Sequence, residues 1–370
     1  MKIKIKKEFK TEILVVGTGI AGLIATERAL KKRKRVCLVT NKKLCGGASY
    51  FPLKGTLGIQ VTKDKDDYER YYEDIVKMGN GMENPELIKT YISNIKNSLY
   101  LLNKIGFEPW LRKDSRPACF AKYPRDIYLI NNWKKAKERC KRKLKNHRGL
   151  NILENSTLVR IVTKDKRVVG AIFQCKQNFI FVKSKVIILA TGGVASNYKD
   201  SLYPEGINGI GHIAALDAGA IAQNIEFIQF IPAFLKPKYN VLFGEHTLKY
   251  CLGMYDLRNN LLLSGVDDEK NKELWIERSS YAPFSVDFKS HIIDLKIPTE
   301  GVSIKYSKEL YENKEEFYTV YLDWLKNDMG IDLLKDNIII SHFAHSCNGG
   351  IKIDEFARTG VNGLYAIGEV

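Results

Sequence analysis

A glycine-rich turn near the start of the chain constrains the fold more than any other feature. The apolar run Ile13–Val16 leads into the spacing Gly17-x-Gly19-x-x-Gly22, and helix-forming residues continue to Lys31. A strand, a tight turn and a helix in this order bring a pyrophosphate against backbone N–H groups at a helix N-terminus. The apolar run Val36–Thr40 then completes a βαβ unit of about 30 residues. The sequence therefore predicts a dinucleotide site at this turn.

A second segment at the other end of the chain strengthens this prediction. Gly363-Leu-Tyr-Ala-Ile-Gly-Glu-Val370 reads as a short strand, a glycine and an acid, and Val186–Gly193 predicts a buried strand that ends in a glycine turn. One glycine fingerprint is a weak signal, but these segments together favour a flavoprotein. An acidic residue often ends the second strand of such sites and binds ribose. Thr40 and Asn41 stand there instead, and both can hydrogen-bond a ribose.

Composition limits the classes of partner. The 370 residues are 45% hydrophobic and can build one large domain or two ordinary ones. The formal charge of +17 comes mostly from lysines along the whole length. In the basic run Trp133–Leu144 the apolar residues recur at helical spacing, so its lysines form the solvated face of a packed helix. We expect no nucleic-acid partner, although a basic surface can attract an acidic substrate.

The cysteines and the N-terminus indicate in which cellular compartment the protein is expected. Seven cysteines occur without a CxxC pair or metal-like spacing, which favours reduced thiols, a cytoplasmic location and no metal or iron–sulfur cluster. Lysines precede an apolar run as in a signal peptide, but that run contains the glycine fingerprint, so export is not expected. No segment reaches the roughly 18 apolar residues of a membrane span.

Further along, the pattern predicts helices, a meander and an insertion. One helix runs to Met78, and another begins after the N-cap Asn84 and ends at Gly106. Four short runs read as an antiparallel meander, and residues 232–335 read as an inserted lobe. The meander runs are Asn151–Leu153, Thr157–Thr163, Val168–Cys175 and Phe179–Val182.

Taken together, these motifs resemble those of the flavoprotein family that contains L-aspartate oxidase and the flavoprotein subunits of succinate dehydrogenase and fumarate reductase. The chain is most similar to L-aspartate oxidase, because those enzymes also tend to replace the acid after the second strand by a hydroxyl residue, as Thr40 does here. The matching segments, in family order, are Gly17–Leu23, Ala190–Gly193, Glu226–Pro232, Glu277–Pro283, His345–Ile351 and Gly363–Glu369.

The resemblance implies an α/β fold: a Rossmann-like FAD-binding domain with an antiparallel meander, plus an inserted α+β capping domain. Residues 1–231 and 336–370 would bind FAD, and residues 232–335 would form the cap. The loop Gly46–Gly58 contains no His, so FAD would be bound non-covalently. The glycines would approach the pyrophosphate, Thr40 and Asn41 the ribose, Ser49 the flavin and Glu369 the ribitol. The cofactor-binding residues implied are Gly17, Gly19, Ala21, Gly22, Thr40, Asn41, Gly47, Ser49, Thr191, Gly192, Gly193 and Glu369.

The chain departs from the family pattern at the substrate site. The family's proton-transfer Arg is replaced by Phe284 and its substrate-binding His by Ile231, while Gly244 replaces a Thr. His345 and Glu245 remain as candidate substrate-binding residues. No proton-transfer residue is assigned, although three charged or protonatable residues flank the missing Arg. These are Arg278, Lys289 and His291.

Three functions stay open on the sequence. The first is an oxidoreductase that passes hydride between flavin N5 and a small, acidic substrate. The second keeps the flavin and acts on a larger, apolar substrate beside Ile231 and Phe284. The third is a flavin-binding protein that has lost catalysis. The electron acceptor is not assigned, and the abrupt stop at Val370 within a motif favours a fragment of a longer protein.

Overall fold

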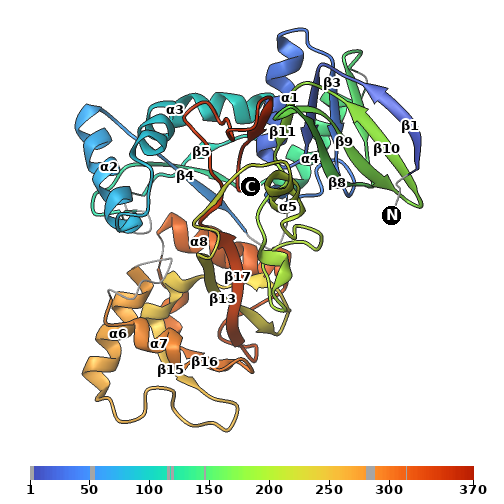
Figure 1. Cartoon of the computed structure of the whole chain (residues 1–370). Helices are drawn as coiled ribbons and strands as arrows, with labels where there is room; N and C mark the ends of the chain where they lie inside the picture. Colours follow the sequence, from blue (N-terminus) through green and yellow to red (C-terminus); the bar gives the residue numbers. More distant parts are fainter. Residues whose placement is uncertain are drawn as a thin grey trace.

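The computed structural model places two layered bodies beside each other. In Figure 1 the parallel sheet and its covering elements occupy the upper part. A separate body below contains the strands β13 (Ile228–Lys236), β15 (Cys251–Tyr255), β16 (Val302–Tyr306) and β17 (Ile339–Cys347). The C-terminus lies between the two bodies. The structure describes residues 4–50, 55–114, 117, 121–145, 147–280, 288–313 and 315–370.

A parallel sheet forms the centre of the upper body. Its inner strands Ile13–Val16 and Val36–Val39 are buried on both faces, which explains why they are continuous apolar runs rather than alternating ones. Leu14 and Val16 join the core on one face of the sheet, whereas Val15 joins the core on the other. The order β19–β11–β2–β3–β7 comprises Leu364–Ala366, Ile187–Leu189, Ile13–Val16, Val36–Val39 and Leu150–Leu153, all parallel.

Helices cover one face of this sheet. α1 (Ile20–Lys31), α3 (Pro85–Lys104) and α4 (Trp133–Leu144) contribute to one buried cluster with β2 and β3. The predicted helix after Asn84 is confirmed, since Asn84 caps α3 by accepting from the N–H of Glu86. The helical spacing in α4 is also confirmed, because its buried residues are those of the predicted apolar stripe: Trp133, Ala136, Cys140 and Leu144.

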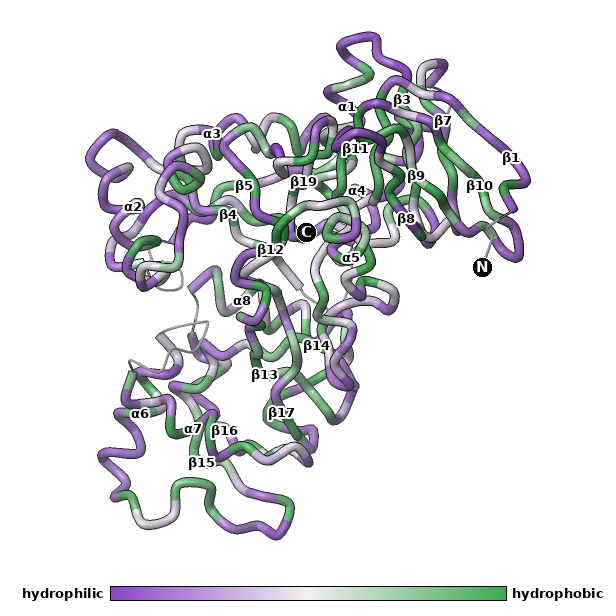
Figure 2. Tube along the Cα trace, in the orientation of Figure 1, coloured by the Kyte–Doolittle hydropathy of each residue, from purple (hydrophilic) through white to green (hydrophobic). Residues whose placement is uncertain are grey.

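A second sheet covers the other face. Its order is β1–β10–β9–β8, antiparallel except for the parallel pair β1–β10. The expectation that Asn151–Leu153 belongs to this meander is wrong, because β7 pairs with β3 in the parallel sheet. β1 is an exposed, mostly hydrophilic edge strand (Figure 2), a composition that discourages further strand pairing. The four strands are Ile5–Lys10, Asn178–Lys183, Arg167–Cys175 and Ser156–Lys164.

A small layer extends from the helical face. α2 (Lys65–Gly79) packs on α3, and beside them lies the antiparallel sheet β4–β6–β5. Arg125 is buried here and pairs with Asp67 at 3.2 Å and Asp74 at 3.1 Å, which ties the sheet to α2. The strands are Leu57–Val61, Asp126–Ile130 and Trp110–Leu111.

The lower body is built on an antiparallel sheet of order β14–β13–β17–β16–β15. β13 runs through the predicted boundary between residues 231 and 232, and β17, from the predicted last stretch, pairs with it. The division at 231 and 335 stays a prediction. The strands are Val241–Leu242, Ile228–Lys236, Ile339–Cys347, Val302–Tyr306 and Cys251–Tyr255. The helices of this part are α6 (Asp268–Ser280), α7 (His291–Lys296) and α8 (Glu316–Trp324).

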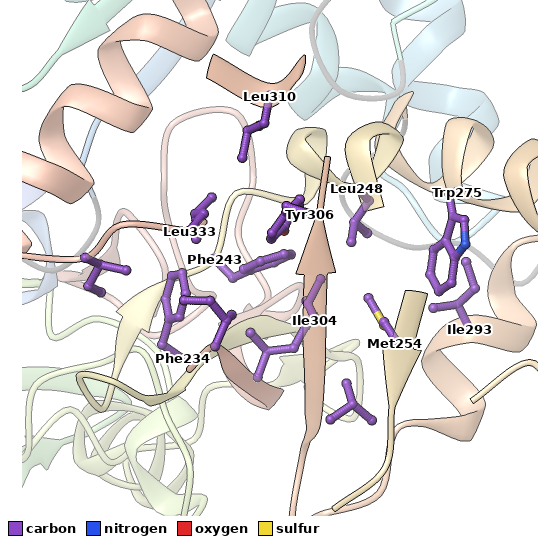
Figure 3. Close-up of a cluster of buried hydrophobic side chains, with 14 of the residues drawn as sticks. Phe234, Phe243, Leu248, Met254, Trp275, Ile293, Ile304, Tyr306, Leu310 and Leu333 are labelled. Atoms are coloured by element: carbon purple, nitrogen blue, oxygen red, sulfur yellow. The ribbon is translucent and has the colours of Figure 1, made fainter. Parts of the chain in front are cut away.

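The lower body has its own hydrophobic core. Figure 3 shows side chains of this core, among them Phe234 of the sheet, Phe243 and Trp275 of α6, which belong to one buried cluster. The rings of Phe234 and Phe243 lie 5.5 Å apart in an edge-to-face arrangement. This cluster is separate from the two that pack on the faces of the parallel sheet.

Short elements connect the two bodies. α5 (Ile210–Asp217) packs on β8, and the strand pair β12 (Ala222–Gln223) and β18 (Gly350–Ile351) lies beside it. Among the helices in the described part of the chain, none is long and apolar enough to cross a membrane.

We expect Leu310→Ala to lower the free energy of unfolding by about 2–5 kcal/mol, because the side chain is fully buried in the lower core. Leu295→Ala is the matched control: Leu295 is 72% exposed, and the same change there should stay within about 0.5 kcal/mol. Urea unfolding followed by tryptophan fluorescence measures both. Equal effects would contradict the described packing.

Candidate functional site

A cavity of about 310 Å³ lies at the carboxyl ends of the parallel strands. In sheets of this type ligands bind at that edge. Two residues expected to bind the cofactor, Gly22 and Gly193, are not part of its lining. The residues expected there that do line it are Gly17, Gly19, Ala21, Thr40, Asn41, Gly47, Ser49, Thr191, Gly192 and Glu369.

The glycines of the fingerprint allow very close packing. Gly17 has φ +115°, and a Cβ there would lie 2.0 Å from the carbonyl oxygen of Ala190. A Cβ on Gly22 would lie 2.0 Å from the carbonyl oxygen of Gly17. Gly22 therefore brings α1 against the turn, while Gly17 and Gly19 form the cavity wall.

Two polar side chains hold the walls of the cavity together. The Ser49 hydroxyl accepts a hydrogen bond from the N–H of Ile20 at 3.1 Å, so it binds the loop to the first turn of α1. The Asn41 amide donates to the carbonyl of Gly206 at 2.8 Å, which ties the end of β3 to the opposite wall. The structure thus places Ser49 and Asn41 in the cavity, with a local role for each.

The cavity fits an elongated, anionic dinucleotide. Gly19 is the N-cap of α1, which has no side-chain cap and no acid in its first turn, so its N-terminus presents the positive end of the helix dipole. The hydroxyl of Thr191 is buried in the wall and has no hydrogen-bond partner among the described residues. An unpaired buried hydroxyl at a cavity wall is a donor or acceptor that a ligand can satisfy.

Glu369 connects the cavity to the lower body. One carboxylate oxygen accepts from the N–H of Cys347 at 2.8 Å, and the other accepts from the Tyr203 hydroxyl. Burial and the Glu369 charge raise the pKa of Tyr203, so the phenol stays protonated and donates. The side chain of Glu369 also lies against Gly193, where a Cβ would approach it to 2.5 Å. No local sequence pattern indicated Tyr203, which is 166 residues away from Glu369.

His345 lies on β17, two residues before Cys347. Its Nδ1 is 2.7 Å from Oε1 of Gln229 on β13, and the imidazole is half-buried. Gln229 belongs to the segment Glu226–Pro232 that carried part of the resemblance, but the sequence did not single it out. Ile231, on the same strand, is 6% exposed and packs with Leu202 and Phe343. Ile231 is therefore a core residue rather than the wall of an open pocket.

Glu245 and Arg278 form an ion pair inside the lower body. The Arg278 guanidinium also pairs with Asp294, with Nε at 2.7 Å and Nη2 at 3.0 Å from its two oxygens. His342 Nε2 is 3.3 Å from Asp294. Arg278 is 2% exposed, and both carboxylates are 7% exposed. The sequence indicated Glu245 and Arg278 but not Asp294 or His342, which come from α7 and β17.

One guanidinium therefore serves two buried carboxylates. Burial raises the pKa of Glu245 and the Asp294 charge adds to this, and together they outweigh the opposing effect of Arg278. Burial also acts upward on the pKa of Asp294, but hydrogen bonds from His342 and Arg278 hold it below its ordinary value. Of the two acids, Asp294 stays ionised and Glu245 takes up a proton more readily.

The other candidates for the missing Arg are differently placed. Lys289 is exposed, and Nδ1 of His291 lies 2.6 Å from the carbonyl oxygen of Phe288 at the start of α7. Phe284, which stands in the sequence where the family has its proton-transfer Arg, lies outside the described residues.

Comparison with known proteins identifies relatives across nearly the whole chain. Residues 12–246 match the family described as FAD binding domain. An uncharacterised FAD-dependent oxidoreductase of Methanocaldococcus jannaschii is 27% identical over 98% of this chain and 66% of that protein. L-aspartate oxidase of Clostridium perfringens is 25% identical over 97% of this chain and 79% of that enzyme.

Solved structures show a similar fold. The apo Sdh1 complex of Mycobacterium smegmatis superposes with a TM-score of 0.76 at 20% identity, covering 98% of this chain and 63% of that chain. The E. coli quinol fumarate reductase FrdA, in its E245Q form, has a TM-score of 0.72 at 17% identity, covering 98% of this chain and 65% of that chain. This chain thus spans about two thirds of the length of the M. jannaschii relative and of both structures.

We expect Gly17→Ala to weaken FAD binding at least about tenfold, because a Cβ collides with the Ala190 carbonyl and moves the turn. Gly265→Ala is the matched control: Gly265 also has a positive φ, +86°, but nothing lies within 4 Å of the added atom. FAD titration followed by flavin fluorescence measures both. Unchanged affinity in Gly17→Ala would contradict the assignment of the turn.

The raised pKa of Glu245 predicts a pH effect. At pH values just above 4.5, the ordinary pKa of a Glu, the folded state still binds a proton on Glu245 that the unfolded chain has already lost. The free energy of unfolding therefore falls as the pH rises from 4.5 through the raised pKa of Glu245. Glu245→Gln removes that dependence. In urea unfolding from pH 4.5 to 7, wild type should lose stability relative to Glu245→Gln as pH rises. Exposed Glu300→Gln should show no such trend, and a constant gap for Glu245→Gln would refute the assignment.

Proposed function

This chain belongs to the family of FAD binding domains, and on that basis we propose that it is an FAD-dependent oxidoreductase of the L-aspartate oxidase and fumarate reductase type. The observation that carries the proposal is the cavity at the carboxyl ends of the parallel strands, whose walls contain ten of the twelve residues expected to bind the cofactor. The L-aspartate oxidase relatives, aligned over nearly the whole chain, support the same reaction class.

The cavity residues would hold FAD non-covalently, since the loop Gly46–Gly58 offers no His for attachment. The turn at Gly17 and Gly19 and the first turn of α1 would hold the pyrophosphate, and Thr40 and Asn41 would lie at the ribose. The Thr191 hydroxyl, which has no hydrogen-bond partner within the described part of the chain, would gain one from the cofactor. When bound, FAD supplies a hydride acceptor or donor at flavin N5.

We propose a small, acidic substrate with His345 as its main contact. His345 lies on the strand that Glu369 ties to the cavity, which keeps the imidazole near the cofactor site. Arg278 already donates N–H groups to Glu245 and Asp294, so these donors are not available for a bidentate contact with a substrate carboxylate. Glu245 and Arg278 would instead fix the shape of the lower body beside the substrate.

The lower body would act as the cap, with the substrate between it and the FAD cavity. Its independent core and the Glu369 connection support this division of roles. A larger apolar substrate is less well supported, because Ile231 is buried in the core and does not line a pocket for such a molecule. The reaction would take place in the cytoplasm, where scattered cysteines stay reduced.

Anaerobic mixing of the FAD-loaded, full-length protein with L-aspartate, succinate or fumarate tests the function. We expect L-aspartate or succinate to bleach the flavin absorbance, or fumarate to reoxidise pre-reduced flavin. His345→Gln should lower the rate at least about tenfold without loss of bound FAD, whereas exposed His147→Gln should not. Flavin that stays unchanged with all three compounds would refute the acidic-substrate reading, and failure with apolar substrates as well would favour a protein without catalysis.

A further inference from the structure

A β-bulge places His345. In the pairing of β13 with β17, Gln229 lies opposite Ser346 and Phe230 lies opposite Ala344, so His345 is the extra residue between them. Successive side chains of a regular strand point to opposite faces. A bulge breaks this alternation and re-aims a side chain, and bulges are common beside functional sites. Here it allows two successive side chains, His345 and Ser346, to reach the same atom of Gln229.

That shared atom determines which nitrogen of the imidazole carries the proton. Oε1 of Gln229 lies 2.7 Å from Nδ1 of His345 and accepts from the Ser346 hydroxyl at 3.1 Å. An amide oxygen can only accept, so Nδ1 must donate. In the neutral ring Nε2 is then the unprotonated nitrogen. The same bond persists when the ring is charged, because Nδ1–H is present in both forms.

We propose that Gln229 is a positioning residue that holds neutral His345 as its Nδ1–H tautomer, with Nε2 as the ring atom that accepts a proton or hydrogen bond from the substrate. The inference rests on the proposed function for the placement of the substrate at His345. It also narrows the class of acidic substrate: a neutral Nε2 acceptor suits one with an N–H or O–H group beside the reacting carbon, as in L-aspartate, whereas succinate and fumarate carry no such group. The proton that leaves this group moves to Nε2 and makes His345 an imidazolium.

Nitrogen NMR of the six histidine rings, labelled with ¹⁵N in the FAD-loaded full chain, tests the proposal. His345→Gln assigns the ring signal. We expect neutral His345 to show a protonated Nδ1 and an unprotonated Nε2. Gln229→Leu removes the acceptor and should shift the neutral ring towards the Nε2–H form. Gln229→Glu should keep the Nδ1–H form and raise the pKa of His345 by about one unit, because a carboxylate stabilises the imidazolium.

Gln174 provides matched controls. It is exposed on β9 and bonds only locally, to the Lys176 carbonyl, so Gln174→Leu and Gln174→Glu should leave the His345 signals unchanged. A neutral wild-type ring with its proton on Nε2 would overturn the proposal. It would also be overturned if neither Gln229 variant changed the tautomer or the pKa of His345. Retained flavin absorbance shows that each variant is folded.

The ring signals do not depend on turnover, which separates this inference from the proposed function. If no substrate reacts but the tautomer responds as expected, the proposed function fails and the positioning by Gln229 stands. Where turnover is found, Gln229→Glu should also shift the lower limb of the pH–rate profile to higher pH by about one unit, since His345 must be neutral to accept a proton. A profile that stays in place would contradict the role of Nε2.

Discussion

The close approach of Gly17 to the carbonyl of Ala190 is the contact on which the rest of the site depends. It brings the turn after β2 against the end of β11, and Gly22 then brings α1 against the same turn. Each contact leaves no room for a Cβ. The cavity wall, the direction of α1 and the positive end of its dipole all follow from this packing.

A second connection makes the two bodies a single functional unit. Glu369 follows the last parallel strand and accepts hydrogen bonds from Tyr203 and from the backbone of Cys347. Cys347 ends β17, the strand that carries His345 and the bulge. A carboxylate at the cofactor cavity thereby sets the position of the strand that presents the proposed substrate contact.

The lower body shows how ionic groups can be buried at moderate cost. Arg278, Glu245 and Asp294 satisfy one another, and His342 bonds the outer side of Asp294. Removing Arg278 would take away the guanidinium that the two buried carboxylates share, and the loss of such a partner is strongly destabilising. The cluster therefore links α6, α7 and β17 through hydrogen bonds and ion pairs.

The local elements followed from the sequence because their signals are local. The fingerprint predicted β2 and α1, the N-cap at Asn84 predicted α3, and the apolar stripe predicted the buried face of α4. The prediction that Asn151–Leu153 belongs to the antiparallel meander was wrong, because a short apolar run does not show which strand it pairs with. Tyr203, Asp294 and Gln229 could not be assigned from local spacing, since each acts on a partner far along the chain.

By itself, the sequence indicated the dinucleotide turn, the helices around it and ten of the residues that line the cavity, because glycine spacing and apolar periodicity act over a few residues. Only the tertiary structure decided that Ile231 is core, that Arg278 is shared between two acids and that a bulge aims His345 at Gln229. These features depend on strand register and on contacts between distant segments, which a one-dimensional pattern does not specify.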